Sequence, residues 1–424
     1  MIEIDTLVVG AGPQALTVVA RWVCDRPSAV EQFIAVDPAG TWLRAWDRQL
    51  ERQRVDVLRS PGVHQPDPDE MALLRAHRYI QRRRCRSGRP EPETLNGPIR
   101  RPTTVAFSGF CRELIERTGL AQRVLPATVS GLRQTGNQRA PRRWEADLSD
   151  GTMVRTSRVL WAGNPHEPNV PPGVRLCEAV VHSTDVDVAA VAPGQRIIVI
   201  GGGQTAGQLA LVAAGSGAEV LLVYRGAQRV VDLDVDAGWL MDNHLTPFRS
   251  IDDPAERRRV VERARRGSMN AELADALHRS SVRWLTDAGE LTARPDGDGV
   301  VVGFAGAEVP ADLVWLATGS RPDLRADPVL AERAAAGAPH VDGWPILDDR
   351  LQWEDGLVIV GALAALTLGP AAGNLGGARA AAELLAADLP PVSAPRPRPS
   401  SCHTGRRALR SVGGPNHRDP RIPG

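Results

Sequence analysis

Two short glycine-rich turns in this sequence have the residue types and the spacing that bind a dinucleotide. The first turn, GAGPQA, covers residues 10–15, and the second turn, GGGQTA, covers residues 201–206. The first glycine of such a turn allows a sharp bend, the second lets the backbone approach a pyrophosphate, and the third position keeps the next helix close to the strand. The phosphate charge then lies at a helix N-terminus, where free N–H groups favour an anion. Two turns therefore predict two dinucleotide sites.

The first turn lies in a compact βαβ unit with a strand at 5–9, a helix at 13–22 and a strand at 33–36. The residues predicted to hold its nucleotide are Gly10, Gly12, Pro13, Gln14, Ala15 and Asp37. Asp37 follows the second strand directly, and a carboxylate at that place accepts hydrogen bonds from ribose hydroxyls. The alternative interpretation is a tight turn that holds no ligand.

The second turn lies in a second βαβ unit, over residues 196–224, and its candidate ligand-binding residues are Gly201, Gly203, Gln204, Thr205 and Arg225. The second strand of this unit ends at Tyr224-Arg225, so no acid occupies the ribose position. An arginine there can bind a 2′-phosphate at two points, whereas a carboxylate would repel it. The pattern predicts NADPH at the second turn and FAD at the first, because nicotinamide and flavin are the usual partners in hydride transfer.

The composition narrows the class of protein. The length of 424 residues predicts two or three domains, and the net charge of +1 gives no global field for nucleic acid or a membrane surface. All 51 basic residues are arginine, so no lysine can act as a base or Schiff base. The five cysteines lack CxxC spacing, which argues against a redox dithiol or a cysteine zinc site and predicts a cytoplasmic setting. No signal peptide and no apolar run long enough to span a membrane are expected.

The order of these segments predicts an α/β protein with two Rossmann-like dinucleotide-binding domains. We expect the NADPH domain, 191–299, to be inserted into a split FAD domain formed by 1–190 and 300–388, with a disordered basic tail at 389–424. Both sheets are expected to be parallel, with the nucleotides at their carboxyl ends.

The remaining segments are interpreted more coarsely. Strands are predicted at 124–132, 143–148, 152–161, 299–304, 313–317 and 357–360, and helices at 106–118, within 254–279 and near 371–387. Residues 41–104 are rich in Arg, Pro and Trp and lack periodicity, so they are expected to be long surface connections.

The order GAGPQA, GGGQTA and ATG resembles the class B flavin monooxygenases, and within them the ornithine and lysine N-hydroxylases. Residues 312–319, DLVWLATG, match that group's D-x-x-x-L-A-T-G motif, and 356–385 resemble the strand, turn and helix that close over the flavin. The resemblance covers 5–388. It implies that Gly163, Thr318, Gly319 and Gly361 lie beside the cofactors. Trp46 is a candidate to shield the flavin ring, although core packing explains it equally well.

The resemblance implies an FAD- and NADPH-dependent monooxygenase of secondary metabolism that uses O2 and N-hydroxylates a primary amine of a small molecule through a C4a-hydroperoxyflavin. It also implies a homo-oligomer. Asn243 and Asn270 fall where the N-hydroxylases place asparagines that contact substrate and nicotinamide, and His64 is a candidate for proton transfer. Helix capping or a turn accounts equally well for the asparagines, and a packed or surface histidine for His64.

Two departures from the pattern leave the substrate open: Ser320 replaces the tyrosine after ATG, and Ala362 replaces an acid after Gly361. The alternatives are an S- or carbon-oxygenating flavin monooxygenase, an NAD(P)H-dependent flavoprotein reductase without oxygenation, and a degenerate fold that binds FAD for structure only.

Overall fold

The computed structural model describes residues 1–85, 95–96, 99–137, 140–297, 299–304 and 306–386, and these belong to one compact unit. The predicted disordered tail lies outside the described residues. Among the described helices, none is long and apolar enough to cross a membrane.

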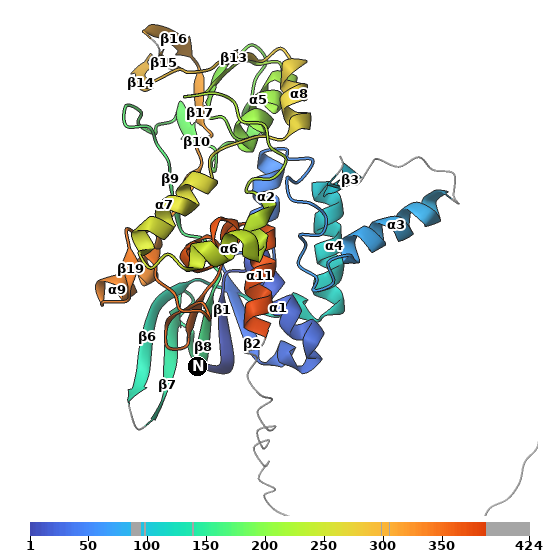
Figure 1. Cartoon of the computed structure of the whole chain (residues 1–424), viewed down its shortest axis with the longest axis vertical. Helices are drawn as coiled ribbons and strands as arrows, with labels where there is room; N and C mark the ends of the chain where they lie inside the picture. Colours follow the sequence, from blue (N-terminus) through green and yellow to red (C-terminus); the bar gives the residue numbers. More distant parts are fainter. Residues whose placement is uncertain (86–94, 97–98, 138–139, 298, 305, 387–424) are drawn as a thin grey trace, which may run out of the picture. The chain divides into compact units, whose positions relative to one another are not determined.

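The first glycine turn lies in a sheet with the strand order β21-β22-β8-β1-β2-β5, shown in Figure 1. Its members are β1 (Ile2–Val9), β2 (Phe33–Asp37), β5 (Val124–Pro126), β8 (Met153–Trp161), β21 (Gln352–Glu354) and β22 (Leu357–Ile359). Apart from the antiparallel pair β21–β22, neighbouring strands on this path are parallel. The antiparallel strands β6 (Val129–Asn137) and β7 (Ala140–Leu148) extend the sheet from β8.

Two helices distant in sequence pack together beside this sheet. Helix α1 (Pro13–Asp25) follows the first glycine turn, and α11 (Leu375–Ala386) lies alongside it. The indole N–H of Trp22 in α1 donates to the carbonyl of Leu385 in α11 at 3.4 Å. The C-terminal part of the described chain therefore completes the core of the N-terminal βαβ unit.

The second glycine turn lies in a five-stranded parallel sheet with the order β10-β17-β11-β12-β13. Its members are β10 (Val180–His182), β11 (Arg196–Ile200), β12 (Glu219–Val223), β13 (Arg283–Leu285) and β17 (Leu313–Leu316). Because side chains of a strand alternate between faces, Ile197 and Val199 of β11 join one core cluster and Ile198 and Ile200 another. The predicted α/β fold class, with a glycine turn in each of two sheets, is confirmed; the second sheet is parallel as expected, whereas the first is mixed, because β6, β7 and β21 pair antiparallel.

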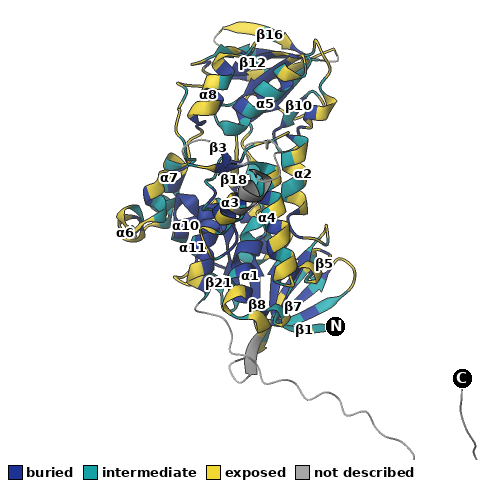
Figure 2. Ribbon diagram, turned by 90° about the vertical axis from the view of Figure 1, so that its right-hand side faces the viewer, coloured by how far each residue is buried: buried dark blue, intermediate teal, exposed yellow. Residues whose placement is uncertain are grey.

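The two faces of the second sheet are covered differently. Helices α5 (Gln204–Gly215) and α8 (Ala271–His278) cover one face, through side chains such as Leu209 and Leu277. The antiparallel strands β14 (Thr292–Asp296), β15 (Gly299–Phe304) and β16 (Ala307–Ala311) cover the other, where Val300 and Val302 are buried. In Figure 2 the exposed residues lie on the outer surfaces of α8 and β16.

The segment that follows the second βαβ unit returns to the first core. It forms η4 (Ala237–Leu240), α6 (Asp242–Arg249) and α7 (Pro254–Ala264), and Phe248 and Val261 belong to the core cluster of the first sheet. Strands β10 and β17 of the second sheet, in turn, lie outside the predicted 191–299 segment. The chain therefore crosses between the two cores more often than one insertion requires, and the domain boundaries stay a prediction.

The expectation that residues 41–104 are surface connections is wrong for a large part of the segment. It forms α2 (Arg44–Arg52), α3 (Ala72–Cys85), β3 (Leu95–Asn96) and β4 (Arg101–Pro102). Leu58, Leu73 and Gln65 are buried, and the side chain of Arg101 is only 2% exposed. Polar side chains in this segment are buried through specific partners, so hydrophobic periodicity does not reveal their burial.

The other helices and strands connect these parts. They are η1 (Pro27–Glu31), α4 (Thr104–Arg117), η2 (Leu120–Gln122), β9 (His166–Pro168), η3 (Val188–Ala190), β18 (Ser320–Pro322), η5 (Leu324–Ala326), α9 (Pro328–Ala335), β19 (His340–Val341), β20 (Trp344–Pro345), η6 (Gly361–Ala364), α10 (Ala365–Leu368) and η7 (Pro370–Gly373).

Candidate functional site

The first glycine turn bends tightly against the neighbouring strand end. Gly10 has a φ of +94°, which favours glycine, and a Cβ there would lie 3.3 Å from the carbonyl carbon of Ala162. The N–H of Gly10 donates to the carbonyl of Val36 at 2.8 Å. Local packing therefore explains the first glycine.

Gly12 differs because the protein itself does not require a glycine there. Its φ of −79° suits any residue, and no atom of the described residues beyond its chain neighbours lies within 4 Å of where its Cβ would be. No side chain caps helix α1 at this end, and Pro13 occupies its first turn. An open approach to an uncapped helix N-terminus is what a pyrophosphate needs.

Asp37 holds the loop beside this approach. Its Oδ2 accepts from the N–H of Ala11 at 3.1 Å, and its Oδ1 accepts from the N–H of Ala39 at 2.9 Å. Each carboxylate oxygen can accept a second hydrogen bond, so the side chain is able to bind a ribose hydroxyl as well.

Gln14 connects the first turn to the C-terminal segment that contains Gly361. This contact is consistent with the prediction that Gly361 lies beside the same cofactor as the first turn. Its Nε2 donates to the carbonyl of Asn374 at 3.1 Å, and its Cγ lies 3.4 Å from where a Cβ on Gly361 would be. The Oε1 of Gln14 is buried and has no partner among the described residues. A buried acceptor without a donor is costly, and a ligand beside it could supply one.

Packing against tryptophan explains Gly163, and Trp46 is placed less decisively. A Cβ on Gly163 would lie 2.8 Å from the indole nitrogen of Trp161. Trp46 is half-buried at a centroid distance of 6.5 Å from Phe107, and its indole N–H has no partner in the described part of the chain. Whether Trp46 shields a flavin stays a prediction.

The second glycine turn is closed over by the chain. Gly201 has a φ of +147°, and a Cβ there would lie 2.2 Å from the carbonyl oxygen of Ala317. The space above Gly203 is filled: a Cβ on Gly203 would lie 3.7 Å from the Cα of Gly267 and 3.9 Å from the backbone nitrogen of Ser268. The loop of residues 265–270, which we call the cover loop, therefore lies where a pyrophosphate would approach.

Arginines from the 41–104 segment fasten the cover loop. Arg59 donates to the carbonyl and the hydroxyl of Ser268, both at 2.8 Å, and to the carbonyls of Val231 and Leu233 at 2.8 and 2.9 Å. Burial of this guanidinium lowers the pKa of Arg59. These hydrogen bonds tie two separate backbone segments to one side chain.

Arg101 adds a second fastening beside Arg59. Its guanidinium forms ion pairs with Asp232 at 2.9 Å and with Glu272 at 2.8 Å. Glu272 lies in the first turn of α8, so the pair also fixes the helix that follows the cover loop.

The two candidate asparagines have different surroundings. Asn270 is 6% exposed and caps α8, since its Oδ1 accepts from the N–H of Leu273 at 2.8 Å. Its own N–H donates to Oε1 of Gln204 at 3.0 Å, which joins the cover loop to the second turn. Asn243 is exposed on α6, and its Oδ1 accepts from the adjacent N–H of His244. No hydrogen bond among the described residues joins the two asparagines, and their roles stay predictions.

His64 lies beside the N-terminal end of α11. Its Cε1 would be 3.2 Å from a Cβ on Gly376, next to Leu240 from η4. Desolvation, and then the positive charge of Arg379, lower the pKa of His64, so the ring is neutral near pH 7. A neutral imidazole at this place is able to accept a proton.

The ATG segment, 317–319, is hydrogen-bonded to two other segments of the chain, at Asn169 and at His182. The hydroxyl of Thr318 donates to the carbonyl of Asn169, and the carbonyl of Gly319 accepts from the N–H of Asn169 at 2.9 Å. The Nε2 of His182 also lies 3.0 Å from the Gly319 carbonyl oxygen. Gly319 has a φ of +74°, so glycine is required there by the backbone.

Among the residues that the structure describes, the end of β12 presents one cation without a partner, Arg225. Arg225 is exposed and has no hydrogen bond or ion pair to any residue that the structure describes, while Thr205 is half-buried at the start of α5. Tyr224 is 2% exposed, its hydroxyl has no partner among the described residues, and desolvation raises its pKa to about 12. The position of Arg225 fits a phosphate that is open to water.

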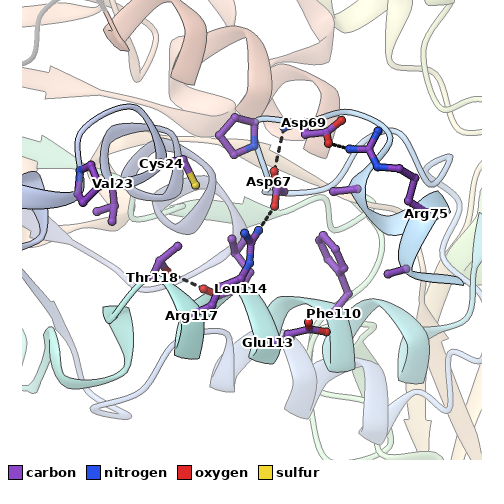
Figure 3. Close-up of a pocket in the computed structure, with 14 residues that line it drawn as sticks. Val23, Cys24, Asp67, Asp69, Arg75, Phe110, Glu113, Leu114, Arg117 and Thr118 are labelled. Carbon is purple, nitrogen blue, oxygen red and sulfur yellow. Dashed lines mark hydrogen bonds and ion pairs between the residues drawn. The ribbon is translucent and has the colours of Figure 1, made fainter. Parts of the chain in front are cut away.

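A cavity of about 750 Å³ lies at neither glycine turn. Figure 3 shows its acids and arginines facing one another: Asp67 pairs with Arg117, and Asp69 pairs with Arg75. These two acids are already paired and no residue of either glycine turn lines the cavity, so it is not the candidate site. The described residues contain no cluster of His, Cys, Asp and Glu that could hold a metal ion.

Sequence reasoning missed several residues around the turns: Arg59, Arg101, Asp234, Arg265 and Asn374. With 51 basic residues in the chain, no arginine stands out by its type. Only the contacts distinguish them.

No known sequence family and no curated protein matches this chain. Solved structures match its fold. The ornithine N-hydroxylase of Kutzneria sp. 744, solved with reduced FAD, NADP⁺ and L-ornithine, has a TM-score of 0.70 at 15% identity over 91% of this chain and 99% of its own. The cadaverine monooxygenase of desferrioxamine biosynthesis from Erwinia amylovora, bound to FAD, has a TM-score of 0.71 at 14% identity over 92% and 94%.

A bacillithiol disulfide reductase from Staphylococcus aureus matches less well, with a TM-score of 0.59 at 13% identity over 92% of this chain and 98% of its own. The chain therefore has the fold of two-dinucleotide-binding-domain flavoproteins, and the resemblance to the N-hydroxylating group is confirmed at the level of fold.

Proposed function

We propose that this protein is an FAD- and NADPH-dependent monooxygenase that N-hydroxylates a primary amine of a small molecule with O2. The observation that carries the proposal is the open approach at Gly12, in a fold shared with ornithine and cadaverine N-hydroxylating enzymes. A glycine that local packing does not need is accounted for by a ligand that comes close to the backbone.

The residues of the first turn fit FAD. The uncapped N-terminus of α1 would receive the pyrophosphate, and Asp37 would bind the ribose. The unpartnered Oε1 of Gln14 lies between this turn and the segment at Gly361, where it would accept a hydrogen bond from the cofactor.

The residues of the second turn fit NADPH once the cover loop has moved. Arg225, exposed and without a partner among the described residues, would bind the 2′-phosphate. The N-terminus of α5 at Gly203 has no side-chain cap and would receive the pyrophosphate, but Gly267 and Ser268 must first leave the space above it.

The flavin, when bound, supplies the redox and oxygen chemistry. The chain must hold the amine, remove its proton and exclude water. His64 is neutral and would accept the proton, a task that no lysine can perform in this chain. Leu240 lies beside it over Gly376 and provides an apolar cover.

The test is purification with added FAD, followed by NADPH oxidation in air with a panel of small primary amines. The expected result is a yellow protein whose NADPH consumption yields a product heavier by one oxygen atom, with the oxygen on nitrogen. Products oxygenated at sulfur or carbon would favour the other monooxygenases, and NADPH oxidation without any oxygenated product in panels of amines and sulfides would favour a reductase. A protein that stays colourless would contradict the proposal.

A further inference from the structure

We propose that Arg265 binds an anionic group of a ligand held beside the first glycine turn. This inference rests on the proposed function, since the ligand is either the flavin or the substrate of that reaction.

Arg265 is fixed to the first core, although it begins the cover loop. It is the residue that ends helix α7, and its N–H donates to the carbonyl of Val261 at 3.0 Å. Val261 is fully buried in the core cluster of the first sheet, and α7 packs against α10 and η7. Movement of Gly267 and Ser268 therefore need not displace Arg265.

The guanidinium reaches the segment that closes over the first turn. Its Nη1 lies 3.2 Å from where a Cβ on Gly373 would be, and the Cβ of Ala362 lies 3.1 Å from the same point. The next residue, Asn374, accepts the hydrogen bond from Gln14 of the first turn. Arg265 is thus separated from the first turn by a single layer of residues.

The hydrogen-bond donors of Arg265 are unused within the described residues, whereas those of neighbouring arginines are not. Arg257 of the same helix donates to the carbonyls of Ile251 at 2.6 Å and Arg249 at 2.8 Å. Arg379 of α11 donates to the carbonyls of Gln65 and Pro68 at 2.9 and 3.0 Å. No described residue forms a hydrogen bond or ion pair with the guanidinium of Arg265. The other two arginines hold the fold together, and Arg265 does not.

Both water and protein surround the side chain of Arg265. The side chain is exposed to water, yet desolvation by the protein around it lowers its pKa, and Asp234 partly offsets this. Asp234 does not form an ion pair with it; its two oxygens lie 3.4 Å from Nδ2 of Asn374. A side chain that water reaches while protein surrounds it is open to a small ligand.

The planar guanidinium favours an anion with oxygen atoms in one plane. Two such groups belong to the proposed reaction. When NADPH gives up a hydride to become NADP⁺, the flavin gains two electrons and one proton, and its ring becomes an anion unless a second proton is added. A carboxylate on the amine substrate is the other source.

The test compares Arg265→Gln with Arg265→Lys, which keeps the charge, and with the control Arg266→Gln. Arg266 is the exposed neighbour in the same loop. The first measurement is the midpoint potential of bound FAD without substrate. A tenfold loss of preference for the reduced flavin lowers this potential by about 30 mV for two electrons.

The second measurement is the dissociation constant of amines that carry a carboxylate and of the same amines without it, from the change they cause in the flavin spectrum. A lowered potential in Arg265→Gln, restored in part by Arg265→Lys, assigns the anion to the flavin. A loss of about tenfold, ~1.4 kcal/mol, for the carboxylate-bearing amines alone assigns it to the substrate.

If Arg265→Gln melts like the wild type, holds FAD and changes neither quantity relative to Arg266→Gln, the inference is overturned while the proposed function stands. Should Arg265→Gln not fold, the comparison of Arg265→Lys with the wild type gives the same two readings, with unchanged values again overturning it. A wild-type protein that never takes up FAD contradicts the proposed function instead.

Discussion

The two glycine turns share a sequence pattern but differ in what lies above their second glycine. At Gly12 the described residues leave the Cβ position open, whereas at Gly203 the Cα of Gly267 lies 3.7 Å from it. Their first glycines differ in degree: a Cβ would meet the backbone at 3.3 Å on Gly10 and at 2.2 Å on Gly201.

Both turns have the sequence pattern that indicates nucleotide binding, but only the first has an open approach for a ligand. The approach to the first turn is open in the described structure, whereas the cover loop contacts the second turn, so we expect a nucleotide at the second turn to displace that loop. A ligand shifts such an equilibrium only by its preference for the open state, so part of its binding energy at the second turn is used to displace the loop.

The largest effect is expected from Gly12→Val. The new side chain would occupy the open approach, so FAD should bind at least about 100-fold more weakly, ~2.8 kcal/mol. The melting temperature of the apoprotein should fall only slightly, because φ is −79° and no described neighbour is within 4 Å, so the cost is that of a poorer helix N-cap, about 1 kcal/mol. Titration with FAD measures the loss.

The matched control for Gly12→Val is Gly109→Val. Gly109 also has an open Cβ position but lies within helix α4 and not at a helix N-terminus. Equal FAD binding by Gly12→Val and Gly109→Val would show that the open space at Gly12 is not a ligand site.

Gly201→Ala should instead reduce the stability of the folded protein. The added Cβ meets the carbonyl oxygen of Ala317, and the φ of +147° is strained for alanine, so we expect a loss of about 3–5 kcal/mol in the free energy of unfolding. Urea denaturation measures it. Gly203→Ala, whose Cβ makes only ordinary contacts, should lose less than about 1 kcal/mol. Equal losses in the two variants would contradict the conclusion that packing requires a glycine at 201 but not at 203.

Arg225→Glu tests the cofactor of the second turn alone. A carboxylate would repel the 2′-phosphate, so the KM for NADPH should rise by about tenfold or more, ~1.4 kcal/mol, while the KM for NADH stays the same or falls. Steady-state NAD(P)H oxidation gives both values. A parallel rise for the two cofactors would place Arg225 outside the 2′-phosphate site.

Arg59→Met should loosen the cover loop. It removes the hydrogen bonds to Ser268, Val231 and Leu233, at a cost of about 2 kcal/mol in stability. The dissociation constant for NADPH should fall severalfold, because the covered state competes with the nucleotide, and FAD binding should not change. Arg48→Met, an exposed residue of α2, is the control. Weaker NADPH binding would mean that the loop assists the nucleotide rather than excludes it.

The smallest effect concerns pH at the first site. Burial lowers the pKa of His64, so folding favours the neutral ring; the associated stability is present above the ordinary histidine pKa of about 6.5 and is lost as pH falls below it. His64→Asn should therefore reduce the loss of unfolding free energy between neutral and mildly acidic pH. The pH dependence of stability that remains in this variant is expected to come from His182, because burial lowers its pKa too. An unchanged pH slope would rule out this titration.

Local patterns predicted much of the fold but little of the packing. The strands at 5–9 and 33–36 and the start of α1 at Pro13 were predictable, because buried β-branched runs and a glycine turn encode their own conformation. The burial of Arg101 was not, since its partners Asp232 and Glu272 lie far along the chain. The sequence also gave Asn270 two interpretations, and the structure shows its cap on α8 while its predicted ligand role stays open.

By itself, the sequence determined that two nucleotide-type turns exist and which residues form them, because a strand, a glycine-rich turn and a helix start form one short local pattern. The tertiary structure alone decided that one turn is open and the other covered, and that within the described part of the chain Arg265 has no partner whereas Arg257 and Arg379 do. The reason is that a covering loop, or an acceptor for a guanidinium, comes from segments remote in the chain, and their approach is fixed only when the two cores pack.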